Sequence, residues 1–425
     1  MVVNPIKYKS KLQAIFHNGL AANMISLGLV QLTNFIIPLI TYPYLFQILG
    51  AERFGIVTYA LNIMLYMTTI VDYGFNLSAP KAVALAKGYT RELSVIVSSV
   101  LQIKIYLFLL VAGIIVIASI IIPEFNKHSN LYVFGIIYVI GNAALPTWLF
   151  QGLEEMKYIT WLNILSKVIL TLLLYLFIKN PDQYIYVVGF YGLANLFSGV
   201  VSMTYAIKKY KIDLTWQTIE TIKGELHNGF SFFISNISSI AFSNSTIIIL
   251  GFFVSNEILG FYSLSEKIAF SVWQLLSIYS QATFPVVCRY AVESVNHLKS
   301  FYKKIYVPFI LLITVFCCCL FIFSDYLVYV ATGEYSIQTV AILKILCWFP
   351  LVVGLNIPAF QVLIAYNKQI YNARLFNIAV IFHLTLCTCL AYYYGSIGAA
   401  WSAVITQSFL TLSLYVIVKR LNILA

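Results

Sequence analysis

Long apolar stretches recur along this 425-residue chain, and they constrain its fold more than any other feature. Many reach the roughly 20 residues that an α-helix needs to cross the hydrocarbon core of a bilayer. Hydrophobic residues make up 61% of the sequence and charged residues only 10%, whereas soluble domains average about 45–50% and about 25%. A chain with so few charged residues cannot cover the surface of a water-soluble protein. The sequence therefore predicts an all-α integral membrane protein.

Twelve stretches are predicted to cross the membrane. They lie near residues 20–42, 56–79, 95–122, 130–152, 159–178, 184–207, 229–253, 260–287, 305–330, 339–366, 375–394 and 399–418. An even number of spans places both termini on the same side. The first stretch lacks a small-residue cleavage site, so we expect it to remain as the insertion signal.

The basic residues divide unequally between the two sets of predicted loops. Nineteen lie on the side of the termini, and only Arg53, Lys127 and Lys179 lie on the opposite side. Cytoplasmic loops carry the excess of Lys and Arg, so both termini are predicted to be cytoplasmic. The net charge of +11 is thereby explained by topology, and we expect no nucleic-acid partner.

The chain also divides into two similar halves. Glu52, Gly55 and Pro80 recur as Glu257, Gly260 and Pro285 at an offset of 205 residues; His17–Gly19 recurs as His227–Gly229, and Phe150, Gln151 and Leu153 as Phe360, Gln361 and Leu363, at an offset of 210. These matches predict a duplicated six-span unit, with an N-terminal lobe (1–207), a cytoplasmic linker (208–228) and a C-terminal lobe (229–425). Parallel repeats in transporters place the substrate path between them.

The linker contains Leu214, Trp216, Ile219, Ile222 and Leu226 among polar residues. This spacing suits a helix lying in the membrane interface. A loose linker is the alternative.

Six ionisable side chains fall inside predicted spans, where their cost usually marks a transport pathway. They are Asp72, Lys104, Lys167, Glu266, Lys267 and Lys344. Four lysines against two acids predict a cationic interior that attracts an anionic substrate, such as a phosphate or pyrophosphate head group or an acidic sugar. Asp72 or Glu266 could couple transport to protons or Na⁺.

Polar residues at helical spacing accompany several of these charges. Lys167 shares a helix face with Asn163, Lys267 with Ser271 and Gln274, and Asp72 with Asn62 and Asn76. Each stripe is typical of a wet cavity wall, and the competing interpretation is polar contacts between packed helices. For Lys167 and Lys267, structural ion pairing is the alternative to a lumen position.

Two lysines have different surroundings. The helical neighbours of Lys104 are apolar, so this lysine could face Asp72 as a buried pair. Lys344 lies near the outer end of its span, where a lumen position and snorkelling to the interface are equally good interpretations. The adjacent Glu266 and Lys267 point about 100° apart on a helix, so they need not neutralise each other.

The sequence lacks three common nucleotide-binding and catalytic motifs. It has no P-loop, no HExxH and no GxSxG. The seven Cys residues show neither metal-ligand spacing nor a disulfide framework. We therefore expect no catalytic residues, no metal and no cofactor.

Several segments resemble the Wzx-type polysaccharide repeat-unit flippases. The first is PLITYPYLFQILGAERFGIVTYA (38–60) followed by VDYGFNLSAPKAVA (71–84), although that pattern often has Arg where Gln47 stands. WLFQGLEEMKYIT (148–160) resembles the fourth span and following loop of that family. GEYSIQTVAILKIL (333–346) and GAAWSAVITQ (398–407) resemble its C-terminal half more loosely.

The resemblance implies the multidrug/oligosaccharidyl-lipid/polysaccharide exporter superfamily, with two pseudo-symmetric six-helix lobes in a MATE-like fold. The implied substrate is an undecaprenyl-pyrophosphate-linked oligosaccharide, flipped across the bacterial inner membrane for O-antigen or capsule assembly. A polysaccharide polymerase and a chain-length regulator are the implied partners. A drug or cation antiporter is the alternative, although its lumen should favour acidic residues, and a membrane-embedded polymerase is the third hypothesis.

Overall fold

The computed structural model describes the backbone of residues 5–423 and the side chains of residues 28–273 and 275–423. These residues form helices and contain no strand. The elements are α1 (Pro5–Asp72), α2 (Phe75–Leu85), α3 (Thr90–Ile121), α4 (Pro123–Asn126), α5 (Ser129–Ala143), α6 (Thr147–Gly152), α7 (Met156–Phe177), η1 (Pro181–Gln183), α8 (Tyr184–Tyr210), α9 (Ile219–Leu250), α10 (Asn256–Ser271), α11 (Trp273–Glu293), α12 (Val295–Phe301), η2 (Tyr302–Tyr306), α13 (Val307–Ile322), α14 (Ser324–Thr332), α15 (Ile337–Leu346), α16 (Phe349–Ala365) and α17 (Gln369–Arg420).

Nine helical stretches in this part of the chain are long and apolar enough to cross a membrane. Two of them reverse direction, because α1 has a non-helical residue at Gly50 (φ 75°) and α17 has one at Gly395 (φ 57°). Glycine adopts such backbone angles without the penalty that a side chain would impose. The prediction of an all-α membrane protein is confirmed. The count of twelve remains an interpretation, in which α1 and α17 each supply two spans and α10 with α11 supplies one.

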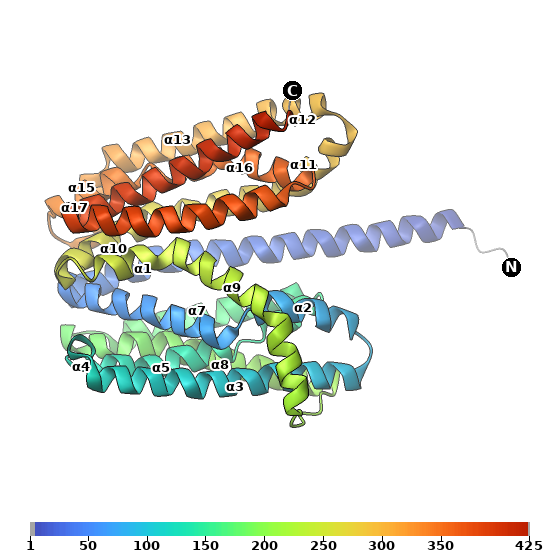
Figure 1. Ribbon diagram of the computed structural model, residues 1–425, viewed down its shortest axis with the longest axis horizontal. Coiled ribbons are helices and arrows are strands. Elements are labelled where there is room, and N and C mark those ends of the chain that lie inside the picture. Colours follow the sequence, from blue (N-terminus) through green and yellow to red (C-terminus); the bar gives the residue numbers. More distant parts are fainter. Residues whose placement is uncertain (1–4, 424–425) are drawn as a thin grey trace.

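The helices pack mainly within two groups. Helices α5 and α7 both pack on α8 and on α1, whereas α9, α10, α15 and α16 pack with α17 or its neighbours. Figure 1 shows these groups as two layers, with α1 running between them and both termini toward the same end. Helices α1, α2 and α3 make the contacts between the groups, chiefly with α9 and α10. The exact lobe boundaries remain a prediction.

The predicted interfacial helix across the whole of 208–228 is wrong. Residues 212–218 are extended, and α9 begins at Ile219 behind the N-cap Thr218. The extended segment lies along α3, whose Ser94 and Ser98 hydroxyls accept the amides of Asp213 (3.0 Å) and Thr215 (3.1 Å). The Gln102 carbonyl accepts the next alternate amide, that of Gln217, at 2.8 Å.

This docking follows from a match of two repeats. Two residues of extended chain advance about 6.6 Å, and four residues of helix advance about 6 Å. Polar side chains at every fourth position of α3 therefore satisfy every second backbone amide of the segment. We call residues 212–218 the strap, because it ties the start of α9 to α3.

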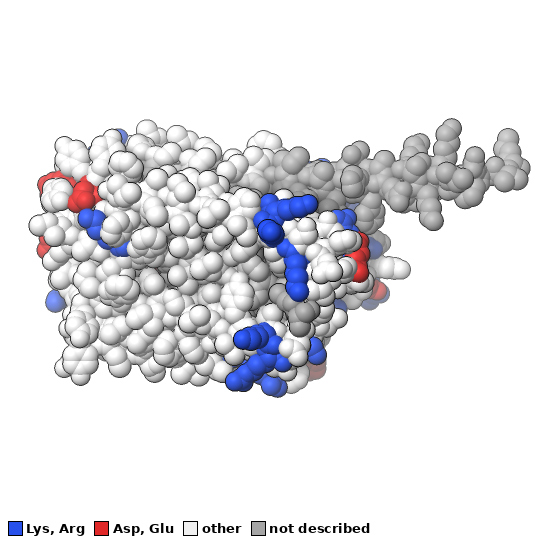
Figure 2. Space-filling view, turned by 90° about the horizontal axis from the view of Figure 1, so that it is seen from above, with Lys and Arg blue, Asp and Glu red and all other residues white. Residues whose placement is uncertain are grey.

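Charge is concentrated at the two ends of the molecule. Figure 2 shows Lys and Arg gathered near the end toward which α1 projects, a wide uncharged band, and a few charges of both signs at the opposite end. We call these the basic end and the far end. The loop between α2 and α3 and the strap after α8 belong to the basic end, and Arg53 pairs with Asp182 at 2.7 Å near the far end.

The tightest contact between the two helix groups is a crossing of α1 and α10 near the far end. Gly55 packs on the carbonyl of Asn256, and Gly260 packs on the carbonyl of Ala51, so closely that a Cβ atom at either glycine would overlap that oxygen. One turn further, the Thr58 hydroxyl donates to Ser263 at 3.0 Å. Each pair is separated by 205 or nearly 205 residues, so equivalent positions of the sequence repeat meet each other. We call this contact the glycine crossing.

The glycine crossing predicts a specific cross-link. In a variant with the seven native cysteines replaced, Thr58→Cys with Ser263→Cys should form a disulfide on mild oxidation, since the two native oxygens lie in contact. A protease site inserted near residue 211 would reveal the bond as two fragments that separate only after reduction.

Ser265 supplies the control. Its hydroxyl donates to the Thr339 carbonyl of α15, on another face of α10. Thr58→Cys with Ser265→Cys should therefore stay reduced. Equal cross-linking of both pairs would contradict the crossing.

Candidate functional site

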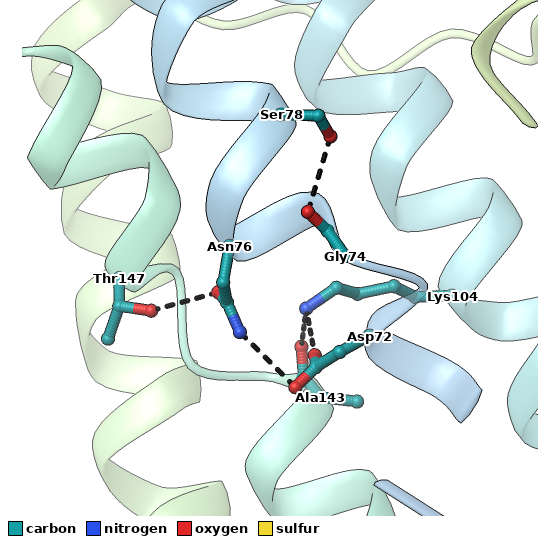
Figure 3. Close-up of polar contacts among 7 residues, drawn as sticks. All are labelled: Asp72, Gly74, Asn76, Ser78, Lys104, Ala143 and Thr147. Carbon is teal, nitrogen blue, oxygen red and sulfur yellow. Dashed lines mark hydrogen bonds and ion pairs between the residues drawn. The ribbon is translucent and has the colours of Figure 1, made fainter. Parts of the chain in front are cut away.

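A break in the helix at Tyr73 and Gly74 lies beside a group of polar contacts in the first half of the chain (Figure 3). Both residues have positive φ, 44° and 76°, so α1 ends at Asp72 and α2 starts in a new direction. The Lys104 ammonium from α3 lies 2.7 Å from the Asp72 carboxylate. It also donates to the Ala143 carbonyl at 3.2 Å, at the end of α5.

The same centre includes the predicted polar residue Asn76. Its amide donates to the second Asp72 oxygen at 3.3 Å, and Thr147 donates to the Asn76 carbonyl at 3.3 Å. Helices α1, α2, α3 and α5 thus meet at one ion pair, and α6 joins them through Thr147. The hypothesis of a buried Asp72–Lys104 pair is confirmed, and only 4% of the Lys104 side chain is exposed.

A second pair lies on α10. The Lys267 ammonium is 3.2 Å from Glu266, so these neighbours form an ion pair, which their angular separation on the helix did not require. The long Lys267 side chain bends back far enough to reach the carboxylate. Its charge also lies 6.0 Å from the ring of Tyr42 in α1, which places it between the two helix groups. Glu266 is 6% exposed and Lys267 28%.

Lys344 is paired near the far end. Its ammonium lies 3.2 Å from Asp325 of α14 and 6.0 Å from the ring of Phe321. With 37% of its side chain exposed, Lys344 is more accessible than Lys104 or Lys267. This ion pair was not expected from the sequence, because Asp325 lies 19 residues away on a separate short helix.

Lys167 differs from the other three lysines. It is half-buried and lies at the middle of α7, and within the described residues no carboxylate is within 4 Å of its ammonium. The hydroxyl of Thr171 bonds only to the Lys167 carbonyl, at 2.8 Å. An unpaired cation held inside a membrane bundle is costly. Three of the four lysines are thus paired with carboxylates, and among the described residues Lys167 has no carboxylate partner.

The remaining predicted polar residues have local roles or stand free. The Asn62 amide donates to the Thr58 carbonyl at 2.8 Å, and the Ser271 hydroxyl donates to the Ile268 carbonyl at 2.7 Å. Asn163 is half-buried on α7 beside Lys167 in the helical repeat. The side chain of Gln274 lies outside the described residues.

A charged cluster at the basic end lies in the loop between α6 and α7. Glu154 pairs with Lys87 at 2.7 Å, and this hydrogen bond and charge hold the pKa of Glu154 below its usual range. Burial raises the pKa of Glu155, but the hydrogen bond and the charge of Lys209 outweigh that effect and leave the pKa lowered. These contacts anchor the loop of the segment 148–160 to α2 and α8.

Sequence reasoning missed a cavity of about 460 Å³ in the second helix group. Its walls come from α9, α11, α16 and both halves of α17, and they carry no charged residue among those described. The polar lining residues are Ser239, Ser243, Ser277, Ser280, Gln281, Asn356, Asn372 and Gln407; the aromatic ones are Phe242, Trp273, Phe360 and Phe376. Uncharged polar residues within predicted spans 7, 8, 10 and 12 were the available signal, and Gln407 is the last residue of the segment 398–407.

Bent membrane helices in two groups, with buried ion pairs and a cavity lined by polar and aromatic side chains, define a multi-pass membrane protein of the transporter class. Residues 20–291 match the family described as polysaccharide biosynthesis protein. The chain belongs to this family.

Two relatives match over almost their whole length. The Escherichia coli (strain K12) protein named "Putative O-antigen transporter" is 29% identical over 410 residues, which cover 96% of this chain and 98% of the relative. A Shigella dysenteriae protein of the same name is 26% identical over 402 residues, covering 93% and 99%.

Solved structures share the fold. The lipid II flippase MurJ in an inward closed conformation superimposes with a TM-score of 0.67 at 14% identity, covering 94% of this chain and 87% of that one. An inward-facing multidrug resistance MATE family transporter gives 0.66 at 16% identity, covering 93% and 94%. The predicted MATE-like fold is confirmed.

The Asp72–Lys104 pair predicts a stability effect that depends on both partners. Asp72→Asn should destabilise the protein by about 3–5 kcal/mol, because it leaves the Lys104 ammonium buried without a carboxylate. Lys104→Met in the same chain should restore most of that loss. Thermal unfolding of the purified protein in detergent measures both changes. An unchanged melting temperature in Asp72→Asn, or no recovery in the double variant, would argue against a structural pair.

Proposed function

We propose that this protein is a flippase that moves undecaprenyl-pyrophosphate-linked oligosaccharide repeat units from the cytoplasmic to the periplasmic leaflet. The family membership and the two named O-antigen transporters support this function. The MATE-like fold supports a transport mechanism rather than chemistry on the glycan. O-antigen or capsule synthesis is the process that this activity serves.

The lack of a carboxylate partner at Lys167 is the observation that best supports an anionic cargo. Its desolvation in the bundle costs several kcal/mol unless an opposite charge compensates it. A pyrophosphate group that arrives with the substrate supplies that charge. Lys267 lies between the helix groups, and its pairing with Glu266 leaves it available for exchange with a substrate anion.

We assign Lys344 and Lys104 lesser roles in binding. Lys344 lies in contact with Asp325 near the far end, where it can meet the head group as it leaves. Lys104 acts through its pair with Asp72, and Asn62 and Asn76 support the polar face of the same helix region. Asn163 and Ser271 line the approach to Lys167 and Lys267.

The orientation follows from the distribution of charge. The basic end faces the cytoplasm, since Lys and Arg are retained on that side, and both termini are cytoplasmic. The protein resides in the bacterial inner membrane as two lobes, 1–207 and 229–425, joined by the segment 208–228. The lobes rock about the glycine crossing, and the lipid tail stays in the bilayer.

Coupling and partners complete the proposal. Asp72 or Glu266 binds the proton or Na⁺ that drives the cycle, because both carboxylates lie within the membrane and beside a cation. A polysaccharide polymerase and a chain-length regulator act on the delivered unit at the outer leaflet.

A clean deletion tests the function. In a strain without a redundant flippase, loss of the protein should abolish surface polysaccharide and leave single lipid-linked units on the inner leaflet. Gel analysis of the polysaccharide and leaflet-specific labelling of the lipid intermediate measure these results. Normal surface polysaccharide would refute the proposal, and accumulation on the outer leaflet would favour a polymerase instead.

Substitution of Lys167 tests the head-group site. Lys167→Ala should lower export about 10- to 100-fold, the factor that corresponds to a lost charge-assisted hydrogen bond of about 1.5–3 kcal/mol. Lys167→Arg should retain most export, because the charge remains. Membrane abundance is measured in parallel by immunoblot.

Lys127 provides the matched control, since it is an exposed lysine outside the membrane helices. Lys127→Ala should export normally. Equal export by Lys167→Ala and wild type, at equal abundance, would remove Lys167 from the binding site.

A further inference from the structure

The cavity in the second helix group has a lining that restricts its ligand. It measures about 460 Å³, within the roughly 300–1,000 Å³ of small-molecule sites. Five helical segments contribute to it, which makes it a built feature of the fold rather than a gap at one contact. Neither Lys167 nor Lys267 belongs to its walls.

Several polar groups on the walls have no partner in the described part of the chain. Asn372 is 8% exposed, and its amide donates to the Phe360 carbonyl at 3.1 Å while its carbonyl oxygen has no hydrogen bond. Gln407 is 4% exposed, and its side chain bonds to no described residue. The side chains of Ser243 and Asn356 are likewise free. The Asn372 carbonyl oxygen is thus a desolvated acceptor without a partner, and the side chains of Gln407, Ser243 and Asn356 are further polar groups that a ligand can bond.

Charge considerations exclude an ionic ligand. No lysine, arginine, aspartate or glutamate stands among the lining residues. A phosphate or carboxylate in this cavity would have no counter-ion, and burial of an isolated charge is strongly unfavourable. The pyrophosphate end of the substrate therefore belongs elsewhere, near Lys167.

An alkyl chain fits no better. It would cover the amides of Asn372 and Gln407 without giving them a hydrogen bond, at a cost of roughly 1–3 kcal/mol for each group. Hydroxyl and amide groups of a ligand both donate and accept, as do the side chains of Asn, Gln and Ser. The aromatic rings of Trp273, Phe242 and Phe376 offer flat apolar faces beside these groups.

We propose that this cavity binds the uncharged sugar residues of the lipid-linked oligosaccharide. The inference rests on the proposed function and places the glycan in this cavity, apart from the lysines proposed to bind the pyrophosphate. Sugar hydroxyls bond to Asn356, Asn372 and Gln407, and the C–H faces of the sugar rings lie on the aromatic side chains. Two sites thus hold two chemically different parts of one substrate.

Saturation-transfer NMR on the full-length protein in nanodiscs tests the site. The probe is the reducing oligosaccharide released by mild acid from the lipid-linked units of the source strain, and inorganic pyrophosphate is the second probe. Wild type should bind the oligosaccharide, and pyrophosphate should not displace it. Displacement by pyrophosphate, or no oligosaccharide binding to wild type, would overturn the inference.

Two variants address the lining. Gln407→Leu removes the free amide at similar volume and should weaken oligosaccharide binding about 3- to 10-fold. Ser243→Phe fills the cavity and should abolish binding. Gel filtration establishes that each variant is folded, and wild-type affinity in folded Gln407→Leu and Ser243→Phe would refute the site.

Ser408 gives the matched control. It follows Gln407 in the chain but lies outside the cavity walls, and its hydroxyl bonds to the Val404 carbonyl at 2.8 Å. Ser408→Ala should bind like wild type. The deletion strain separates the two proposals, because normal export there would refute the flippase function, whereas loss of export with unaltered binding in the variants would refute only the cavity assignment.

Discussion

The absence of water in the bilayer core is the constraint on which the rest of this structure depends. Every backbone amide must bond within the protein, so the spans are helices and the bends occur where other groups compensate. The lack of water also favours the pairing of opposite charges within the bundle. Asp72 with Lys104 and Glu266 with Lys267 are close pairs, and each lies where a helix ends or two helix groups meet. Lys167 stands apart from this pattern, and for that reason it is informative about the cargo.

At the glycine crossing, equivalent positions of the two sequence repeats contact each other. Gly55 and Gly260 are equivalent in the repeat, and each packs against the backbone of the other half. A close approach of small residues is how membrane helices gain contact area without a hydrophobic driving force. Because equivalent positions of the two repeats meet here, the proposed rocking of the two halves has its pivot at this contact.

The proposed separation of the glycan and pyrophosphate sites rests on the different polar groups of the two halves. The first half contributes an unpaired cation on α7 and a buried ion pair at a helix break. The second half contributes an uncharged cavity with free amides and aromatic walls. A lipid-linked oligosaccharide also has a charged part and a neutral part. The strap along α3, fixed by Ser94, Ser98 and Gln102, connects the two halves at the basic end.

The sequence by itself determined the membrane helices, the duplication and the six membrane charges, because hydropathy, repeat spacing and residue identity are local properties. It also indicated the Asp72–Lys104 pair, since both residues lie on neighbouring spans. Only the tertiary structure decided that Lys344 meets Asp325, that Lys267 bends back to Glu266, and that the linker is a strap. It alone brought Asn372 and Gln407 to one cavity. The physical reason is that ion pairs and cavities depend on how helices distant in sequence are rotated against each other, and helix rotation is set by packing over the whole bundle.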